Sequence, residues 1–333
     1  MIQHDDGHVR LPLLVTGVAG VAGYNAFAYF RRLYGEQVIG TRRVDNWPLS
    51  GEGIEPCDAD DRDGLVRLCR KYRFASVLNC EGTCKLKSCE LDPAMARRIN
   101  VEGLSYLLEA IGPEPRFVHL SIDLVFSGRR EGGYTEEHPT DPVTVYGATM
   151  VESERLVAHY RPDACTLRIS LPMGISFNGH AGAIDWIGSR FRKNKPATLY
   201  FDEVRTPAYT DCLNRLFRRV LASNLSGLYH AGGPRRLSLF QIAQIVNRVG
   251  GYDPDLLMGC LRHQAGPIPP RAGDVTLDSS KLAQALGHDV LDPWPYTERF
   301  VPDDSNWHRR RSRIHPGSPE LLTRVLYRNP VRG

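Results

Sequence analysis

Apolar residues in the first half of the chain follow two alternating patterns. Short apolar runs bounded by turn residues are typical of buried strands, and stretches with apolar residues every three or four positions are typical of helices. The first pattern predicts strands at residues 11–17, 37–43, 75–80, 116–126 and 165–170. The second predicts helices between them, at residues 24–35, 61–73, 93–112 and 145–160. Strands that alternate with helices form a parallel sheet covered on both faces, so the predicted fold is α/β with a doubly wound parallel sheet.

The pattern loosens after residue 170. It still predicts one strand, at residues 227–233, and helices near residues 183–196, 211–224 and 238–251. We therefore expect a sheet domain and a smaller C-terminal lobe that lies over the ends of the strands. The sheet domain comprises residues 11–170 with the strand at 227–233, and the lobe comprises residues 171–226 and 234–300. Residues 1–10 are expected to form a polar leader, and residues 301–333 a basic tail.

The composition narrows the class of protein. Hydrophobic residues make up 42% and charged residues 24% of the chain, as in ordinary globular domains. The formal net charge of +4 is too small to indicate a protein that binds nucleic acid or membranes, and the "HRRRSR" run of the tail is interpreted as a solvated basic face. There is no apolar run of about 18 residues to predict a membrane span. The polar N-terminus "MIQHDDGHVR" is not a signal peptide.

The eight cysteines are interpreted as free thiols. Cys80, Cys84 and Cys89 lie four and five residues apart without a nearby histidine, which is a poor zinc pattern. Unpaired cysteines suit a reducing compartment, so we expect a cytoplasmic protein that has no metal site.

The stretch "TGVAGVAG" stands between the first predicted strand and the first predicted helix. Its glycines allow a sharp turn, close approach of the backbone to a pyrophosphate, and close packing of the helix on the strand; they are Gly17, Gly20 and Gly23. Val21 and Ala22, between the second and third glycines, are also expected to bind the cofactor, and the free N–H groups and positive dipole end of the following helix face the phosphates. A glycine triplet in this position predicts a Rossmann-type dinucleotide site.

The end of the second strand bears on the choice of dinucleotide. A site for NAD usually has Asp or Glu here, which accepts a hydrogen bond from the ribose 2′-hydroxyl. This chain has Arg42 and Arg43, whose guanidinium groups suit the 2′-phosphate of NADP. Asp45, two residues further on, keeps NAD open, and Asp58 is expected near the adenine.

Longer motifs resemble a known family. They are "INVEGLSYLLEA", "FVHLSIDLVFSG", "DPVTVYGATMVESERL", "RTPAYTDCL" and "PPRAGDVTLDSSKL". With the glycine spacing they resemble the extended short-chain dehydrogenases over roughly residues 11–295, and most nearly the dTDP-4-dehydrorhamnose reductases. The regulatory beta subunit of methionine adenosyltransferase is similar too. The resemblance implies a Rossmann-type sheet with a smaller C-terminal substrate lobe, NADPH or NADH as cofactor, and a 4-keto nucleotide sugar as substrate.

The resemblance also implies chemistry by Ser/Thr, Tyr and Lys. In the family the tyrosine protonates the ketone oxygen, the lysine lowers the pKa of the tyrosine, and the Ser/Thr hydroxyl binds the substrate oxygen. Carried over, the tyrosine is Tyr146, but Met150 stands at the lysine position and Ile122 at the Ser/Thr position. Ser121 is beside Ile122, on the opposite face of the strand. A thioether has no charge and donates no hydrogen bond, and losing general acid catalysis typically costs about 10²–10⁴ in rate.

A third departure lies in the loop after the strand at residues 75–80. Cys80, Glu81 and Gly82 are expected to line the cofactor, where the family usually has small residues. A carboxylate near a pyrophosphate is repelled unless it is paired or protonated.

Three functions are therefore open. The leading hypothesis is a reductase with rearranged machinery, in which Lys85 or Lys87 replaces the lysine and Glu81 or Asp123 acts as the acid. The second is a catalytically silent NADP-binding protein that acts as a regulatory or scaffold subunit. The third is different chemistry in the same pocket.

Substrate binding is expected in the smaller lobe. Arg271 stands where the family often has a substrate-binding arginine, and Arg205 and Lys85 are further candidates for binding a diphosphate. Asn178 and His180 follow the strand at residues 165–170, near the sheet edge where ligands bind in such folds. The expected partner is a small molecule, a nucleotide sugar; no nucleic acid or membrane partner is expected, and a homodimer is left open.

Overall fold

The computed structural model of the chain describes residues 8–311 and 316–331. Most of the predicted polar leader, and part of the predicted basic tail, therefore lie outside the described residues. Within the described ranges, no helix is long and apolar enough to span a bilayer.

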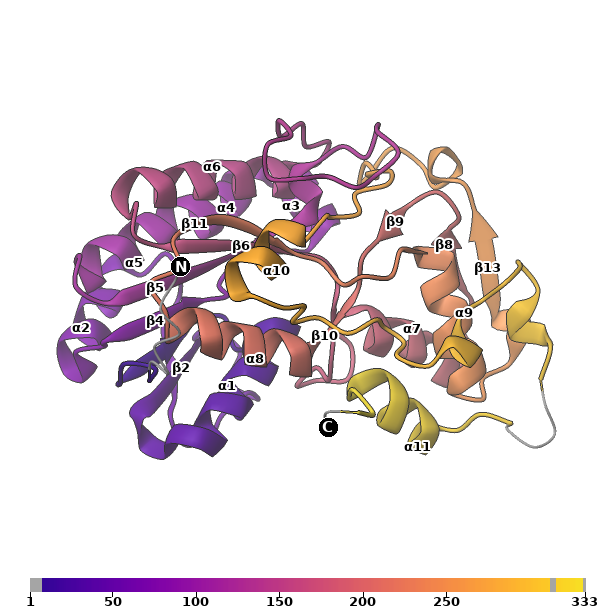
Figure 1. Cartoon of the computed structure of the whole chain (residues 1–333), viewed down its shortest axis with the longest axis horizontal. Coiled ribbons are helices and arrows are strands. Elements are labelled where there is room, and N and C mark those ends of the chain that lie inside the picture. The colour runs from indigo at the N-terminus through magenta and orange to yellow at the C-terminus, as the bar shows by residue number, and fades with distance from the viewer. Residues whose placement is uncertain (1–7, 312–315, 332–333) are drawn as a thin grey trace.

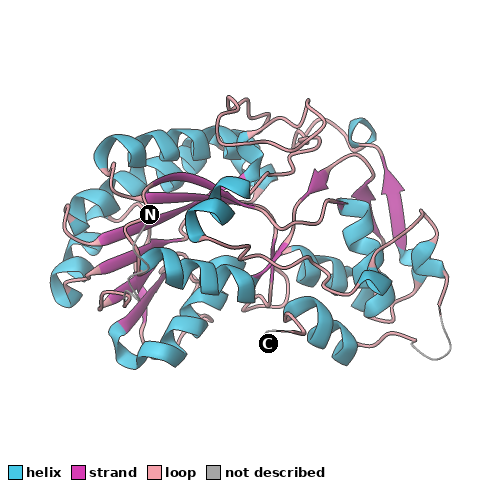
Figure 2. Cartoon of the chain, viewed as in Figure 1, coloured by secondary structure: helices cyan, strands magenta, loops and turns pink. Residues whose placement is uncertain are grey.

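The centre of the molecule is a parallel sheet of seven strands (Figures 1 and 2). In spatial order they are β11 (Gly227–Ala231), β6 (Cys165–Ile169), β5 (Arg116–Ile122), β4 (Ser76–Asn79), β1 (Leu13–Val15), β2 (Val38–Arg42) and β3 (Ile54–Pro56). The order reverses between β1 and β4, where Leu14 is in register with Val77 on one side and with Ile39 on the other. This arrangement confirms the predicted doubly wound α/β fold, in which ligands bind beyond the carboxyl ends of the strands at the reversal.

Helices cover both faces of the sheet (Figure 1). One face packs against α2 (Arg62–Tyr72), α5 (Gly103–Ile111) and α6 (Val145–Tyr160), and the other against α1 (Val21–Tyr34) and α8 (Thr210–Leu221). Successive strand residues point to opposite faces, so Leu13 and Val15 belong to the core beside α1, whereas Leu14 belongs to the core beside α2 and α5. The apolar runs of the sequence are continuous because both faces of each strand are buried.

Two predicted elements end differently in the structure. The helix predicted at residues 93–112 is divided into α4 (Pro93–Arg97), a π-helical turn (Arg98–Glu102) and α5, because the side chain of Asn100 is held by hydrogen bonds outside its own helix. The strand predicted at residues 116–126 stops at Ile122, and a 3₁₀ turn (Asp123–Val125) follows. A short helix that the pattern did not indicate, α3 (Leu86–Leu91), precedes α4.

The second lobe lies beyond the carboxyl ends of the strands (Figure 1). Its helices are α7 (Ala183–Arg192), α9 (Leu239–Val249) and α11 (Pro319–Leu322), and α10 (Ser280–Leu286) packs on β11. Its short strands pair two by two: β13 (Leu257–Cys260) with β8 (Ala197–Tyr200), β12 (Leu237–Ser238) with β9 (Val204–Arg205), and β10 (Ala208–Tyr209) with β7 (Pro172–Met173). These strands of two to four residues carry no periodicity that a sequence could reveal.

The C-terminal segment packs on this lobe. Leu322, Val325 and Leu326 are buried, and the indole N–H of Trp294 donates a hydrogen bond to the carbonyl of Leu326. His308 is also buried, at 2% exposure. Arg309 and Arg310 of the "HRRRSR" run are exposed, as expected of a solvated basic face, whereas His308 of the same run is not.

Candidate functional site

The glycine loop forms a cradle between β1 and α1. Gly17 has a φ of +65°, and a Cβ there would lie 2.5 Å from the carbonyl oxygen of Cys80. A Cβ on Gly23 would lie 2.3 Å from the carbonyl oxygen of Gly17, so both positions require glycine. Over Gly20 the nearest atom would be 3.5 Å away, which leaves that face open.

The first turn of α1 is ready to bind an anion. Its N-cap is Gly20, and among residues 8–311 and 316–331 no side chain accepts a hydrogen bond from the N–H groups that follow, including those of Val21 and Ala22. An uncapped helix start of this kind presents N–H donors and a positive dipole end to phosphate oxygens. The residues present therefore fit a dinucleotide pyrophosphate.

The arginines at the end of β2 have partners within their own loop. Arg42 donates hydrogen bonds to the carbonyl oxygens of Arg43 and Val44, at 2.7 and 3.1 Å. Arg43 makes a two-bond ion pair with Asp45, at 3.0 and 2.6 Å, on the surface. The carboxylate of Asp58 accepts a hydrogen bond from the backbone N–H of Val44 at 2.9 Å and so fixes the same loop.

Glu81 lies against the glycine cradle. The hydroxyl of Thr16 accepts hydrogen bonds from the backbone N–H groups of Cys80 (3.0 Å) and Glu81 (3.2 Å), which holds the end of β4 beside the end of β1. The backbone of Glu81 also lies against the glycine turn, since its Cα would be 2.8 Å from a Cβ on Gly17. Burial raises the pKa of this carboxyl to about 7, although the N–H of Gly17 and the charge of Arg43 act in the opposite direction.

Tyr146, Met150 and Ile122 lie in one apolar cluster at the carboxyl end of β5. Helix α6 starts at this point because the Thr144 hydroxyl caps it, accepting a hydrogen bond from the N–H of Gly147 at 2.9 Å. Tyr146 and Met150, one turn apart, are 8% and 4% exposed. The structure thus brings together the three positions at which the resemblance implies Tyr, Lys and Ser/Thr.

The Tyr146 hydroxyl has no hydrogen bond to any residue in the ranges 8–311 and 316–331. Burial raises the pKa of this phenol well above its ordinary value, and Cys84, Asp123 and Cys89 add to the effect. The positive charge of Arg205 lowers the pKa of Tyr146. The phenol is therefore neutral over the physiological range of pH.

Ser121 points away from this cluster. Its hydroxyl donates a hydrogen bond to the carboxylate of Glu154, which also pairs with Arg168 through two hydrogen bonds of 2.8 and 2.7 Å. The Nη1 atom of Arg168 also lies 3.2 Å from the Nε2 atom of His230. The Ser121 hydroxyl is committed to a buried polar network between the sheet and α6.

Asp123 and Arg205 form a buried ion pair next to Tyr146. Arg205 Nη1 donates to Asp123 at 2.6 Å and Arg205 Nη2 donates to Glu203 at 2.8 Å; Asp123 also accepts a hydrogen bond from Ser170 at 2.5 Å. Burial raises the pKa of Asp123, while the guanidinium beside it acts in the opposite direction. For Arg205, burial alone would lower the pKa, but Asp123 and Glu203 hold it above its ordinary value.

Arg271 completes this cluster from the second lobe. Its Nη1 lies 3.7 Å from Glu203 Oε2, an oxygen that is buried and accepts no hydrogen bond within the described part of the chain. The guanidinium is 4.7 Å from the ring centre of Tyr200, and its side chain remains 23% exposed. Of the two arginines expected to bind substrate, Arg271 is the one with an exposed guanidinium, whereas Arg205 is enclosed by carboxylates.

The other expected substrate-binding residues lie elsewhere. Lys85 and Lys87 are exposed around the start of α3 and make no ion pair within residues 8–311 and 316–331. Asn178 folds its side chain back on its own turn, accepting hydrogen bonds from the N–H groups of His180 and Ala181 at 2.9 and 3.1 Å. This turn lies near the start of α1, because a Cβ on Gly182 would be 2.6 Å from the side chain of Val21.

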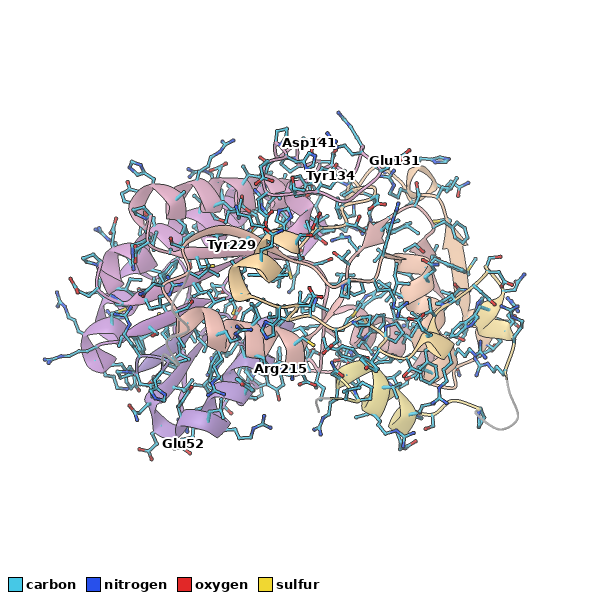
Figure 3. All side chains as sticks on the ribbon, in the orientation of Figure 1. Glu52, Glu131, Tyr134, Asp141, Arg215 and Tyr229 are labelled. Atoms are coloured by element: carbon cyan, nitrogen blue, oxygen red, sulfur yellow. The ribbon has the colours of Figure 1, made fainter. Side chains whose placement is uncertain are left out.

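The long connection from residue 127 to residue 141 runs along the upper edge of the molecule in the view of Figure 3. Tyr134 and Asp141 belong to it; Asp141 accepts hydrogen bonds from the backbone N–H and the hydroxyl of Ser127 at 2.8 and 2.6 Å. Glu131 bridges to Asp274 of the second lobe. These contacts tie the catalytic end of the sheet to the segment that carries Arg271.

One buried polar chain that the sequence did not reveal joins the two ends of the site. Thr16 donates to Asn79 (2.6 Å), Asn79 Nδ2 donates to His119 Nδ1 (2.9 Å), His119 Nε2 donates to Ser153 (3.2 Å), and Ser153 donates to the carbonyl of Met150 (2.7 Å). Burial lowers the pKa of His119 to about 4, so the ring is neutral. The signal available in the sequence was the polar residue inside each of two apolar strands.

Asn100 is a second residue that the sequence analysis missed. Its Oδ1 accepts a hydrogen bond from the N–H of Thr83 at 2.7 Å, and its Nδ2 donates to the hydroxyl of Thr149 at 2.9 Å. Thr149 in turn donates to the carbonyl of Tyr146 at 2.8 Å. A polar residue at the centre of a long apolar helix was the signal for it.

All eight cysteines are free thiols, and no group of three or more His, Cys, Asp or Glu side chains in the described ranges could hold a metal ion.

Comparisons with known proteins identify the family of the chain. The family model described as the RmlD substrate binding domain matches residues 11–299. A probable low-salt glycan biosynthesis reductase of Haloferax volcanii is 25% identical over 82% of this chain and 91% of its own length. A dTDP-4-dehydrorhamnose reductase of Aggregatibacter actinomycetemcomitans is 24% identical over 91% of this chain and 97% of its own. The methionine adenosyltransferase 2 subunit beta of Danio rerio is 21% identical over 84% of this chain and 85% of its own.

Solved structures share the fold. The dTDP-4-dehydrorhamnose reductase of Bacillus anthracis, in complex with NADP, has a TM-score of 0.72 and 19% identity, over 85% of this chain and 95% of that one. The UDP-glucose 4-epimerase of Thermus thermophilus, in complex with NAD, has a TM-score of 0.71 and 24% identity, over 83% and 93%.

Proposed function

The chain belongs to the RmlD substrate binding domain family, and from that membership we propose that it is an NADP(H)-dependent reductase of a keto group on a nucleotide-activated sugar, with an atypical active site. The observation that carries the proposal is the position of Tyr146. Its buried phenol lies at the carboxyl end of β5, and its hydroxyl has no partner in the described part of the chain. The relatives named as dTDP-4-dehydrorhamnose reductases support the choice of substrate class.

The proposed cofactor site is the glycine cradle with the start of α1. The open face over Gly20 and the uncapped N–H groups of the helix suit a pyrophosphate. A bound reduced dinucleotide would supply the hydride. The NADP complex of the structural relative from Bacillus anthracis supports this cofactor, and Arg42 and Arg43 are the residues proposed to hold its 2′-phosphate.

Tyr146 is the proposed proton donor. Its raised pKa keeps it in the protonated form, so it can transfer its proton to the ketone oxygen as the carbonyl carbon becomes tetrahedral. Met150 supplies no charge to stabilise the phenolate that results. Arg205 is a cation that acts on the phenol, but Asp123 and Glu203 offset its charge. We therefore expect slower proton transfer than an unpaired lysine would allow.

Substrate recognition is proposed for the exposed cations around the site. Arg271 has a partly exposed guanidinium beside the catalytic cluster, and Lys85 and Lys87 carry ammonium groups that no carboxylate within the described ranges neutralises. Diphosphate groups bind guanidinium and ammonium groups through charge-assisted hydrogen bonds. A sugar nucleotide held by these groups would place its keto sugar toward Tyr146.

Steady-state oxidation of NADPH with a panel of 4-keto sugar nucleotides tests the proposal. Turnover is expected with at least one of them, and Tyr146→Phe should lower kcat by about 10²–10⁴. Phenylalanine keeps the ring packing, so calorimetry should show unchanged binding of NADP. An unchanged kcat in Tyr146→Phe would contradict the proposed role of the phenol.

A silent regulatory or scaffold subunit is the second candidate, because Met150 and Ile122 both stand where the family's catalytic side chains would be and the pKa of Tyr146 is raised. The similarity to a methionine adenosyltransferase subunit also supports it. Cofactor binding without turnover of any keto sugar would favour this candidate over the reductase. Activity gained by Met150→Lys would then indicate that a catalytic function has been lost.

The cytoplasm is the proposed location, since free thiols persist in a reducing compartment.

A further inference from the structure

The proposed dinucleotide site contains a carboxylate, Glu81, but it follows β4 and not the second strand, where such an acid usually stands. In a Rossmann-type site the adenosine ribose lies beyond the ends of the first two strands, and an acid at the end of the second strand accepts the ribose hydroxyl. Here that strand ends in Arg42 and Arg43, whereas the acid comes from the end of β4. Glu81 lines the same small pocket as Thr41, at the end of β2, and its Cα would lie 2.8 Å from a Cβ on Gly17. The chain therefore has both a carboxylate and guanidinium groups at the ribose end of the proposed dinucleotide site.

The charges around Glu81 come from each neighbouring strand end. Arg43 follows β2 and Asp58 follows β3. The neighbouring thiols of Cys57 and Cys80 are neutral, because burial raises their pKa. Arg43 is bound to Asp45, so only part of its charge is available to an incoming phosphate. With Asp45, Asp58 and Glu81 all ionised, three carboxylates face two guanidinium groups.

These contacts lead to an inference that rests on the dinucleotide site proposed above. We propose that Glu81 selects the dinucleotide: its ionised carboxylate accepts hydrogen bonds from the ribose hydroxyls and repels a 2′-phosphate, and its protonated form admits the phosphate to Arg42 and Arg43. Protonation removes one negative charge from the site and converts an oxygen acceptor into a donor. The choice between NAD and NADP then depends on a proton held by this side chain.

The direction of the effect follows from the chemistry. The pKa of Glu81 is raised to about 7, so the neutral form that admits NADP predominates below that pH and the ionised form that favours NAD predominates above it. The ratio of the dissociation constant of NADP to that of NAD should therefore rise with pH. A unit charge near the phosphate, partly screened by solvent, changes the affinity on the order of tenfold.

Calorimetric binding of NADP⁺ and of NAD⁺ at pH 6, 7 and 8.5 tests this, because it does not depend on turnover. The 2′-phosphate itself titrates near pH 6, so wild type must be compared with Glu81→Gln, which keeps that titration and a side-chain oxygen acceptor. The ratio should rise about tenfold across this range in wild type and much less in Glu81→Gln, which should bind NADP⁺ about tenfold more tightly at pH 8.5. Glu36→Gln replaces an exposed carboxylate in the 3₁₀ turn after the C-terminal end of α1, far from the glycine turn at its other end; it is the charge-matched control and should behave as wild type.

A second variant guards against a folding defect at Glu81. Asp45→Asn frees Arg43 on the surface and should tighten NADP⁺ binding at every pH without changing the pH at which the ratio shifts. Equal pH dependence of the ratio in wild type and Glu81→Gln would overturn the proposal while leaving the dinucleotide site intact. Failure of both dinucleotides to bind any variant would overturn the proposed cofactor site as well.

Discussion

The two ends of the site are built from different parts of the chain. The cofactor end is made mainly by backbone: the Gly17 turn, the close approach of Gly23 and the uncapped start of α1. The proposed catalytic end is made by side chains: Tyr146 lies among Met150, Ile122 and a buried ion pair. A backbone cradle tolerates little change because Gly17 and Gly23 have no room for a Cβ. Side chains at the catalytic end can change while the same helix and strand remain, so fold and cofactor site are retained more readily than the reaction.

The largest effect is expected from the ion pair at the catalytic end. Arg205→Met leaves Asp123 and Glu203 buried without their cation, and should lower the free energy of unfolding by about 3–5 kcal/mol. Urea denaturation followed by circular dichroism measures it. Arg43→Met, which breaks an exposed pair, is the matched control and should cost less than about 1 kcal/mol. Similar losses in the two variants would mean that this cluster is not the structural support of the catalytic end.

A smaller effect is expected at the cofactor end. Gly17→Ala places a methyl group 2.5 Å from a backbone oxygen at a φ of +65°, and should lower the free energy of unfolding by about 2–4 kcal/mol. Gly20→Ala has space for its methyl group and should leave stability within about 1 kcal/mol of wild type. Because that methyl group lies on the open face, Gly20→Ala should nevertheless weaken NADP⁺ binding in calorimetry. Equal stability of the two variants would remove the case for a cradle that depends on backbone.

The smallest effect is expected from Glu81, beside the glycine cradle, on the pH dependence of the free energy of unfolding. The pKa of Glu81 is about 7 in the fold and 4.5 in the unfolded chain, so its contribution to stability is complete below pH 4.5 and is lost as the pH rises through 7. Relative to Glu81→Gln, wild type should lose about 1–2 kcal/mol over that window, allowing for partial exposure of the side chain. Denaturant midpoints at pH 5 and pH 8 provide the measurement. A wild type that gains stability over the same window would show that the carboxylate is well solvated or well paired.

Much of the fold could be predicted because its signal is local. Five of the six sheet strands in the first half were located from periodicity, together with four helices, whereas the short strand β3 was missed. Helix α6 has the predicted bounds, Val145–Tyr160, because a capping threonine starts it. The division of the long helix at Asn100 could not be predicted, because the π-turn depends on contacts with Thr83 and Thr149. The short strands of the second lobe were missed because each one is defined by its pairing partner.

The site shows the same division. The glycine cradle and the positions of Tyr146, Met150 and Ile122 could be read from spacing. The enclosure of Arg205 by Asp123 and Glu203 could not, because residues 82 positions apart form the first of those pairs.

By itself the amino-acid sequence determined the parallel sheet, the glycine cradle and the absence of a lysine one turn after Tyr146, since these depend on short-range periodicity and on residue identity. The tertiary structure alone decided that Glu81 lies against the Gly17 turn, that Arg205 is neutralised where it meets the phenol, and that a neutral His119 connects the two ends. The physical reason is that charge and hydrogen bonding act through space. The strand ends that gather these groups are brought together by the sheet, not by their order in the chain.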